Sequence, residues 1–131
     1  MSSPSEEQTH NISAAAASVR KFQKELSAGI ISLALLSLLA NAKEPLYGYQ
    51  IAKDLEGFAS GPPVKQGTLY PVLRSLEASQ LVISRVEPSI SGPPRRYYSI
   101  TDEGQHALEL WKSIWNSTRE FIDAVLEENN G

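Results

Sequence analysis

Apolar residues recur every three or four positions near the start of the chain, which is the spacing of one face of an α-helix. After a loose polar tail of eleven residues, this pattern predicts a short amphipathic helix over residues 12–26, with an apolar face of Ile12, Ala15, Val19, Phe22 and Leu26. An uncharged, nearly all-apolar run of 17 residues then reaches Ala42. It lies at the lower length limit for a membrane span, but serines and an asparagine interrupt it. We therefore interpret it as a core helix.

Pro45 ends this run and separates it from two further predicted helices, because proline disfavours helical geometry at the residue before it. The first begins near Gly48, has Gly57 in its end region, and is expected to bury Tyr49, Ile51, Ala52 and Leu55. After a loop at residues 60–63, the second runs from Gly67 to Ser79 and has an apolar side of Leu69, Val72, Leu73 and Leu76. At 100° per residue, its opposite side consists of Gly67, Tyr70, Pro71, Arg74 and Ala78.

Two β-like runs follow, at residues 81–86 and 95–100, and they predict a hairpin with a protruding loop over residues 87–94. Thr101 is expected to cap a last helix that reaches about Glu128. Helices followed by a basic hairpin indicate a winged helix-turn-helix. The predicted fold class is mainly α with a small β hairpin, divided into an N-terminal tail and extra helix (1–26), the winged helix-turn-helix (27–100) and a C-terminal dimerisation helix (101–131).

The composition narrows the function classes further. The 131 residues carry 12 basic and 15 acidic side chains, two histidines and no cysteine. Disulfides and thiolate metal sites are therefore excluded, and a His-rich metal site or a paired general base lacks material. Nucleotide-binding and nucleophile motifs are also absent from the sequence, so we expect no enzyme, metal or cofactor. The N-terminus lacks the features of a signal peptide, which favours a cytoplasmic location.

The charges are distributed unevenly along the chain. Residues 60–100 have a net charge of +3, whereas residues 1–59 have −1 and residues 101–131 have −5. An acidic chain can still bind nucleic acid, because only the surface that meets phosphate has to be positive.

Three stretches of this sequence resemble the signature segments of the PadR family of transcriptional regulators: residues 46–51 (LYGYQI), 67–77 (GTLYPVLRSLE) and 92–104 (GPPRRYYSITDEG). The resemblance covers about residues 27–126, and the single C-terminal helix is similar to that of the short subfamily. It implies a bacterial or archaeal homodimer, in most cases a repressor. Many such proteins release DNA when a small aromatic or amphipathic compound binds. The N-terminal extension of about 26 residues departs from the common pattern.

The exposed side of the helix at 67–79 is the predicted recognition surface for double-stranded DNA. Tyr70 and Arg74 would enter the major groove, while basic side chains of the hairpin would hold the backbone or the adjacent minor groove. Tyr97 and Tyr98 point to opposite faces of a strand, so one is expected in the core. A phosphate contact from Tyr47 is one alternative, and core packing is equally expected for Tyr47 and for Tyr49. The candidate DNA-binding residues are Lys65, Gln66, Thr68, Tyr70, Arg74, Arg95, Arg96 and Tyr47.

The last helix carries a stripe at alternating spacings of three and four, as in a coiled coil. Since one domain cannot easily bury this stripe, we expect a twofold homodimer that also uses the N-terminal helices and binds a palindromic operator. In multidrug-binding members of the PadR family, a tryptophan at the position that matches Trp115 stacks on planar ligands, so the resemblance implies a ligand site here. The alternative for Trp115 is ordinary packing in the dimer interface. The seam or ligand residues are Leu108, Trp111, Trp115, Ile122 and Val125, together with Thr118 on the stripe.

A second function class remains open from the sequence. A winged helix can serve as a protein-interaction or ligand-sensing module without binding a specific operator, and the overall acidity is compatible with such a role. The basic central segment favours the DNA-binding regulator.

Overall fold

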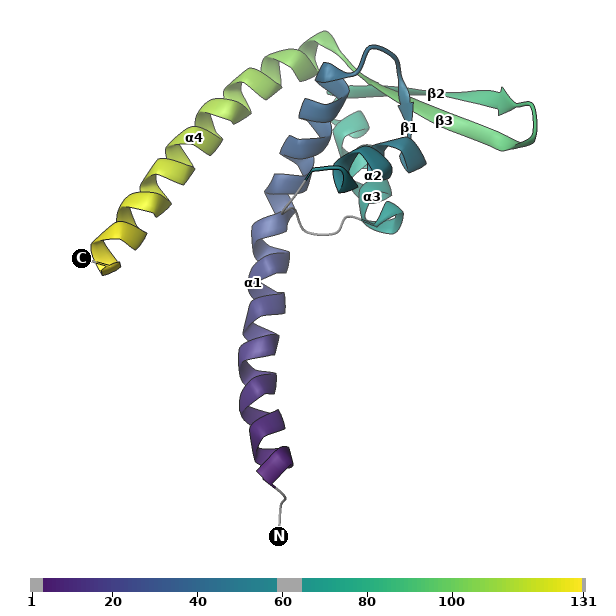
Figure 1. Ribbon diagram of the computed structural model, residues 1–131. Coiled ribbons are helices and arrows are strands. Elements are labelled where there is room, and N and C mark those ends of the chain that lie inside the picture. The colour runs from purple at the N-terminus through teal and green to yellow at the C-terminus, as the bar shows by residue number, and fades with distance from the viewer. Residues whose placement is uncertain (1–3, 59–64, 131) are drawn as a thin grey trace. The chain divides into compact units, whose positions relative to one another are not determined.

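The computed structural model describes residues 4–58 and 65–130, and side chains within residues 13–58 and 65–128. Within these described residues there are four helices and three strands (Figure 1): α1 (Pro4–Asn41), β1 (Leu46–Tyr47), α2 (Gly48–Glu56), α3 (Gln66–Ala78), β2 (Val82–Ser89), β3 (Gly92–Ile100) and α4 (Asp102–Asn130). This order confirms the predicted class, mainly α with a small antiparallel sheet. The predicted loop at 60–63 lies outside the described residues.

The N-terminal segment is one helix of 38 residues, not a loose tail followed by two helices. That prediction was wrong because residues 12–41 contain no proline that would break the helix, and the change from an amphipathic to an all-apolar pattern at Leu26 alters only which faces are apolar. The chain divides into two compact units, residues 1–31 and 32–131, so α1 belongs partly to each.

By length and composition alone, the Ser13–Asn41 part of α1 could cross a membrane. In the second unit, however, Leu35, Leu36 and Leu39 are buried, as in the core helix of a folded domain. The core interpretation is therefore confirmed for this end of the helix. In the first unit, Val19 and Phe22 of the predicted apolar face are exposed.

The sheet has the strand order β1-β3-β2 with both pairs antiparallel. Tyr98 of β3 faces Leu46 on one side and Ser84 on the other, and it is only 3% exposed. This settles the open alternative: Tyr98 belongs to the core and Tyr97 lies on the outer face of the sheet. The strand β1 was not predicted from the sequence, because its two residues are too few to show an alternating pattern.

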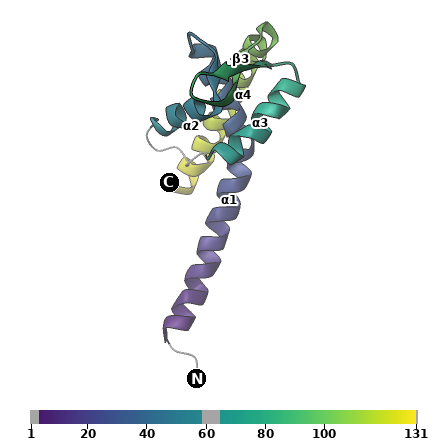
Figure 2. The ribbon, with the colours of Figure 1, turned by 90° about the vertical axis from the view of Figure 1, so that its right-hand side faces the viewer.

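The hairpin is longer and its turn tighter than expected. Strands β2 and β3 run on beyond α3 (Figure 1), so that the hairpin points toward the viewer in Figure 2, and only Ile90 and Ser91 connect the two strands, in place of the predicted loop at 87–94. The prolines indicated a loop because they lack an N–H for the ladder. Pro88 instead falls where the register shifts between Glu87 and Ser89, and such an irregularity tolerates a missing donor.

The predicted helix faces are largely confirmed. Leu69, Leu73 and Leu76 of α3 are buried and Val72 is half-buried, as Ile51 and Ala52 are buried and Leu55 is half-buried in α2. The prediction that Tyr49 is buried was wrong, since 52% of it is exposed. Its ring stacks on Tyr47 with the centroids 6.4 Å apart, which gives it an aromatic partner outside the core.

The start of α4 is tied to the end of α3 by hydrogen bonds. The Gly104 N–H donates to Thr101 Oγ1 at 3.0 Å, which confirms Thr101 as the cap. The same hydroxyl donates to the Gln80 carbonyl at 2.7 Å, and the Thr101 N–H donates to the Leu81 carbonyl at 3.0 Å. These bonds fix where the winged domain ends and α4 begins.

Candidate nucleic-acid interface

The outward side of α3 is the first part of the candidate interface. Tyr70 and Arg74 are exposed, together with Gly67, Pro71 and Ala78, as the helical spacing predicts. Lys65, at the N-cap position, and Thr68 in the first turn are also exposed, whereas Gln66 is half-buried. The outward side of α3 therefore carries a tyrosine and an arginine one helical turn apart.

The Tyr70 ring packs against Gly48, a residue that the sequence analysis did not relate to Tyr70. A Cβ atom built on Gly48 would lie 2.5 Å from Tyr70 Oη and 2.9 Å from its Cζ. The tyrosine ring thus covers the beginning of α2, where any larger residue would collide with it. The glycine in the segment 46–51 was the available signal, but only the packing shows that it accommodates the Tyr70 ring.

The outer face of the sheet places Arg95 on an aromatic ring. The Arg95 guanidinium carbon lies 4.5 Å from the centroid of the Tyr47 ring, and the Tyr97 ring meets Tyr47 edge-on at 5.5 Å. Tyr47 is only partly buried, so it packs and remains accessible. The two alternatives for Tyr47 therefore do not exclude each other in this geometry.

Arg96 lies on the opposite face of the hairpin, toward α3. Its Nη1 donates to Ser84 Oγ at 3.0 Å, and Ser84 Oγ donates to the Glu77 carboxylate at 2.5 Å. This chain of hydrogen bonds connects the wing with the last turn of α3. Sequence reasoning missed Ser84 and Glu77, since nothing in a strand pattern shows which helix residue faces it. The two arginines of the wing therefore make different contacts: Arg95 packs on an aromatic ring, whereas Arg96 is hydrogen-bonded to the Ser84–Glu77 pair.

Burial and ion pairing complete the electrostatics of the wing. Burial raises the pKa of the Tyr98 phenol above its ordinary value, so this hydroxyl stays protonated at neutral pH. Arg85 Nε lies 2.9 Å from Glu87 Oε1, and the two side chains are 67% and 44% exposed. Such a surface pair contributes little stability, but it offsets the charge of Glu87 beside Arg95.

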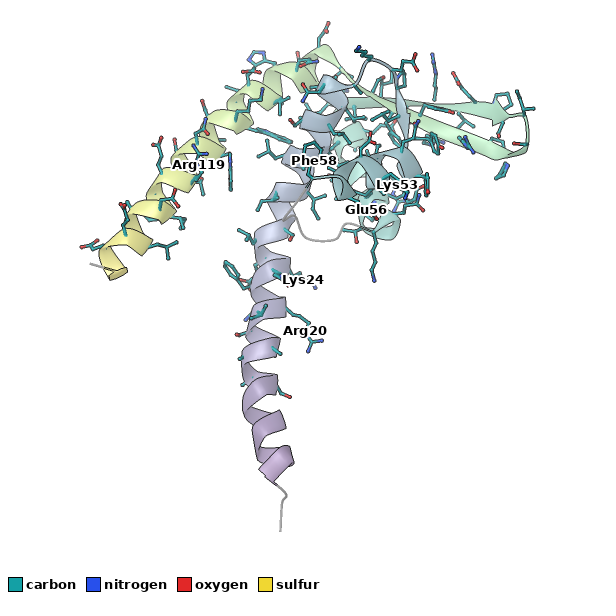
Figure 3. All side chains as sticks on the ribbon, viewed as in Figure 1. Arg20, Lys24, Lys53, Glu56, Phe58 and Arg119 are labelled. Atoms are coloured by element: carbon teal, nitrogen blue, oxygen red, sulfur yellow. The ribbon has the colours of Figure 1, made fainter. Side chains whose placement is uncertain are left out.

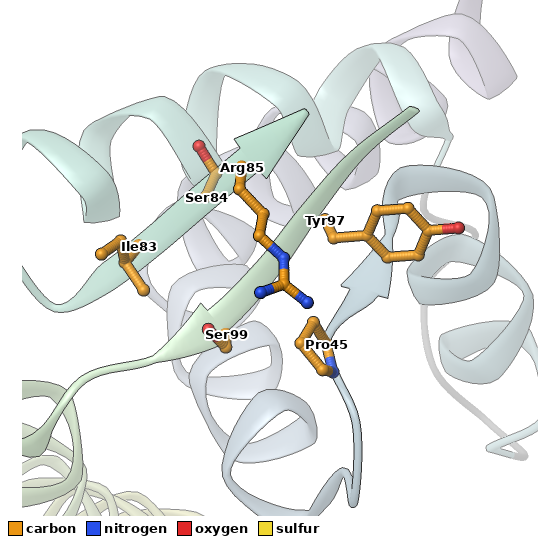
Figure 4. Close-up of a pocket in the computed structure, with 6 residues that line it drawn as sticks. All are labelled: Pro45, Ile83, Ser84, Arg85, Tyr97 and Ser99. Atoms are coloured by element: carbon orange, nitrogen blue, oxygen red, sulfur yellow. The ribbon is translucent and has the colours of Figure 1, made fainter. Parts of the chain in front are cut away.

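The outer face of the sheet also has a shallow hollow of about 160 Å³ (Figure 4). The Arg85 side chain extends across β3 toward Pro45, and the complete lining is Pro45, Ile83, Ser84, Arg85, Tyr97 and Ser99. This volume is below that of ordinary small-molecule sites, which start at about 300 Å³. Within the described part of the chain, no three His, Cys, Asp or Glu side chains are grouped to hold a metal ion.

The helix α4 exposes more apolar surface than its predicted stripe. Leu108 is buried within the chain, but no residue described from Glu109 to Glu128 is. Of the stripe, Trp111 is half-buried and Trp115, Ile122 and Val125 are exposed. Leu110, Ile114 and Phe121, which the stripe omitted, are exposed as well. The structure brings the predicted seam residues onto one helix but covers only its first turns.

Comparison with known proteins shows which family this chain is similar to. The family described as "Transcriptional regulator PadR-like family" matches residues 35–110. A crystal structure of a PadR family transcriptional regulator from Eggerthella lenta is 34% identical and has a TM-score of 0.73, covering 87% of this chain and 96% of that one. One from hypervirulent Clostridium difficile is 32% identical (TM-score 0.61; 73% and 97% covered). A PadR-like regulator from Bacillus cereus is 29% identical (TM-score 0.61; 78% and 96%). No functionally curated protein matches the sequence.

Proposed function

Because this chain belongs to the PadR-like family of transcriptional regulators, which bind DNA and are not enzymes, we propose that it is a cytoplasmic homodimeric repressor of a palindromic operator. The observation that carries the proposal is the exposed pair Tyr70 and Arg74 on α3, beside a wing with Arg95 and Arg96. All four belong to the one segment of the chain with a positive net charge.

In this proposal the two parts of the interface have different tasks. Tyr70 and Arg74 read base edges in the major groove, with Lys65, Gln66 and Thr68 at the N-terminal end of α3 contacting bases or phosphates. Arg95 and Arg96 hold the DNA backbone, which fixes the register without reading sequence. The link from Arg96 through Ser84 to Glu77 supports this division, because it keeps the wing in a constant position relative to α3.

Exchanging single arginines separates these tasks. We expect Arg74→Ala to relax sequence discrimination, with operator binding reduced about 10- to 100-fold and random-DNA binding nearly unchanged, since one good base contact contributes about 1–3 kcal/mol. Arg95→Ala should weaken binding to both DNAs by a similar factor and reduce the salt dependence. Gel shifts with DNA from upstream of the protein's own gene and with random DNA, repeated over a salt series, measure both effects.

Equal losses of Arg74→Ala on operator and random DNA would contradict its assignment to base readout. If the unaltered protein binds neither DNA, the second function class gains instead, a winged helix that binds protein or senses a ligand. The overall net charge of −3 is the feature that favours this second class.

The exposed apolar residues of α4 support the dimer. A stable dimer has to bury a surface of this kind, and the coiled-coil spacing of Trp115 and Ile122 suits a symmetric partner. We expect sedimentation equilibrium at micromolar concentration to give a dimer, and Trp115→Asp with Ile122→Asp to give a folded monomer with weaker operator binding. A monomeric unaltered protein would contradict this part of the proposal.

The same helix supports an effector site between the two copies. Trp115 is 40% exposed, and indole faces attract planar or cationic compounds by stacking and cation–π interaction. If such a site regulates DNA release, planar amphiphiles quench the tryptophan fluorescence of the dimer and weaken operator binding, and this quenching is absent in Trp115→Ala. Ordinary interface packing predicts no quenching by any of them.

A further inference from the structure

We propose that the DNA contact extends beyond the recognition helix and the wing, along a strip of tyrosines and cations formed by Lys53, Tyr49, Tyr47 and Arg95. This tyrosine–cation strip would bind the phosphate backbone that borders the major groove. The inference rests on the proposed function, because it assigns further residues to the same DNA interface. It adds Lys53 of α2, and it gives a role in DNA binding to Tyr49, which the sequence pattern assigned to the core but which is 52% exposed.

The strip is continuous across three elements. Lys53 Nζ lies 5.9 Å from the centroid of the Tyr49 ring, one helical turn away on α2. The Tyr49 ring stacks on Tyr47 of β1, with an angle of 20° between the ring planes. Arg95 of β3 covers Tyr47 in turn at 4.5 Å. A cation therefore stands at each end of a pair of aromatic rings.

The strip is accessible to a large ligand. Tyr49, Lys53 and Arg95 are exposed, and Figure 3 shows Lys53 pointing outward from α2. Among the hydrogen bonds of the described residues, none involves the hydroxyl of Tyr49. Tyrosine hydroxyls, lysine and arginine are all donors, and a phosphodiester offers only acceptors. The strip thus has the donor chemistry that a nucleic-acid backbone requires.

The acids near the strip do not cancel its charge. Glu87 is opposite Arg95 in the strand register, but its carboxylate pairs with Arg85 at 2.9 Å. On α2, Glu56 follows Lys53 by one turn on the side away from Tyr49, where it marks the end of the strip. Within the residues described, neither Lys53 nor Arg95 forms an ion pair. Both cations are therefore available to a polyanion.

The strip adjoins the residue proposed to read bases. Tyr70 Oη lies against Gly48, which stands between Tyr47 and Tyr49 in the chain. A duplex that receives Tyr70 in its major groove would thus bring the bordering backbone to these two tyrosines. This continuity favours DNA over another polyanion as the occupant, because phosphate contacts beside a base-reading helix are what position it.

The test measures how binding of the full-length protein depends on salt, using fluorescence anisotropy on the operator duplex and on a random duplex of equal length. Lys53→Ala should weaken binding to both duplexes by the same factor, about 3- to 10-fold, and lower the slope of log K against log salt by about 0.9 per lost phosphate contact. Tyr49→Phe keeps the stacked ring and removes only the hydroxyl, so it should weaken both similarly but less. Lys53→Arg should restore the slope.

Lys112→Ala is the matched control, because Lys112 is an exposed lysine that pairs with Glu109 on α4. Its slope should equal that of the unaltered protein, and thermal melts should show that Lys53→Ala and Tyr49→Phe remain folded. Unchanged slopes for Lys53→Ala, or losses confined to the operator, would overturn the strip while leaving the proposed function intact. Absence of DNA binding by the unaltered protein would overturn both.

Discussion

We expect Gly104→Ala, which adds a single methyl group, to destabilise the winged domain strongly. A Cβ atom at this position would collide with the backbone carbonyl oxygen of Leu81 and lie 2.6 Å from Ile100 Cγ1. The Leu81 oxygen also accepts the Thr101 N–H, so neither partner can move without breaking the connection between β2 and α4. The clash is with backbone, and no side-chain rotation relieves it.

We expect the substitution to lower the free energy of unfolding by about 3 kcal/mol, mainly from overpacking against the Leu81 backbone, together with weakened hydrogen bonds at the start of α4. For a domain of this size the midpoint of thermal unfolding falls by roughly 10–20 °C. Circular dichroism melts of the unaltered and substituted proteins measure this shift. A change below about 3 °C would show that α4 moves aside freely and that the junction is not rigid.

Gln80→Gly is the matched control at the same junction and has the opposite expected sign. Gln80 has a φ of 66°, the left-handed region, after the last turn of α3. Its N–H donates to the Glu77 carbonyl, and the Leu81 N–H donates to the Leu76 carbonyl, as in helix ends that normally contain glycine here. Glycine removes the steric cost of this conformation, so stability should rise by about 1 kcal/mol.

The elements that sequence reasoning predicted well are those whose signal is local. The two sides of α3 follow from helical spacing, and Thr101 as a cap follows from its place before two acids. The errors occurred where a local signal has two meanings. Prolines indicated a loop in the hairpin but occupy a register shift, and Tyr49 was assigned to the core because it is aromatic, although it stacks on a neighbour outside it.

Contacts between distant segments were not predictable from one sequence. Spacing along a strand shows that Arg96 faces away from Arg95, but not that Ser84 and Glu77 receive it. Likewise, no periodic pattern in the sequence indicates that Gly48 lies against the Tyr70 ring. The site residues were therefore predictable by type and by face, while their supporting partners depend on tertiary packing.

We expect Gly48→Ala to reduce operator affinity while leaving the stability of the fold nearly unchanged. The added methyl group would lie 2.5 Å from Tyr70 Oη, the far end of a flexible side chain that is 39% exposed, so an outward rotation of this side chain would relieve the clash. Because alanine is also the better helix former, we expect the free energy of unfolding to change by less than about 1 kcal/mol. Operator affinity should fall about 10- to 100-fold, since Tyr70 no longer holds its place on the base-reading face.

A double-mutant cycle decides whether displacement of Tyr70 is the cause. In a Tyr70→Ala background there is no ring to displace, so adding Gly48→Ala should not reduce operator affinity further. Additive losses in gel shifts would show that Gly48 acts by another route, such as close approach of the α2 backbone to DNA. Comparison with random DNA separates these cases again: displacement of a base-reading side chain reduces discrimination, whereas a blocked backbone approach weakens binding to every sequence alike.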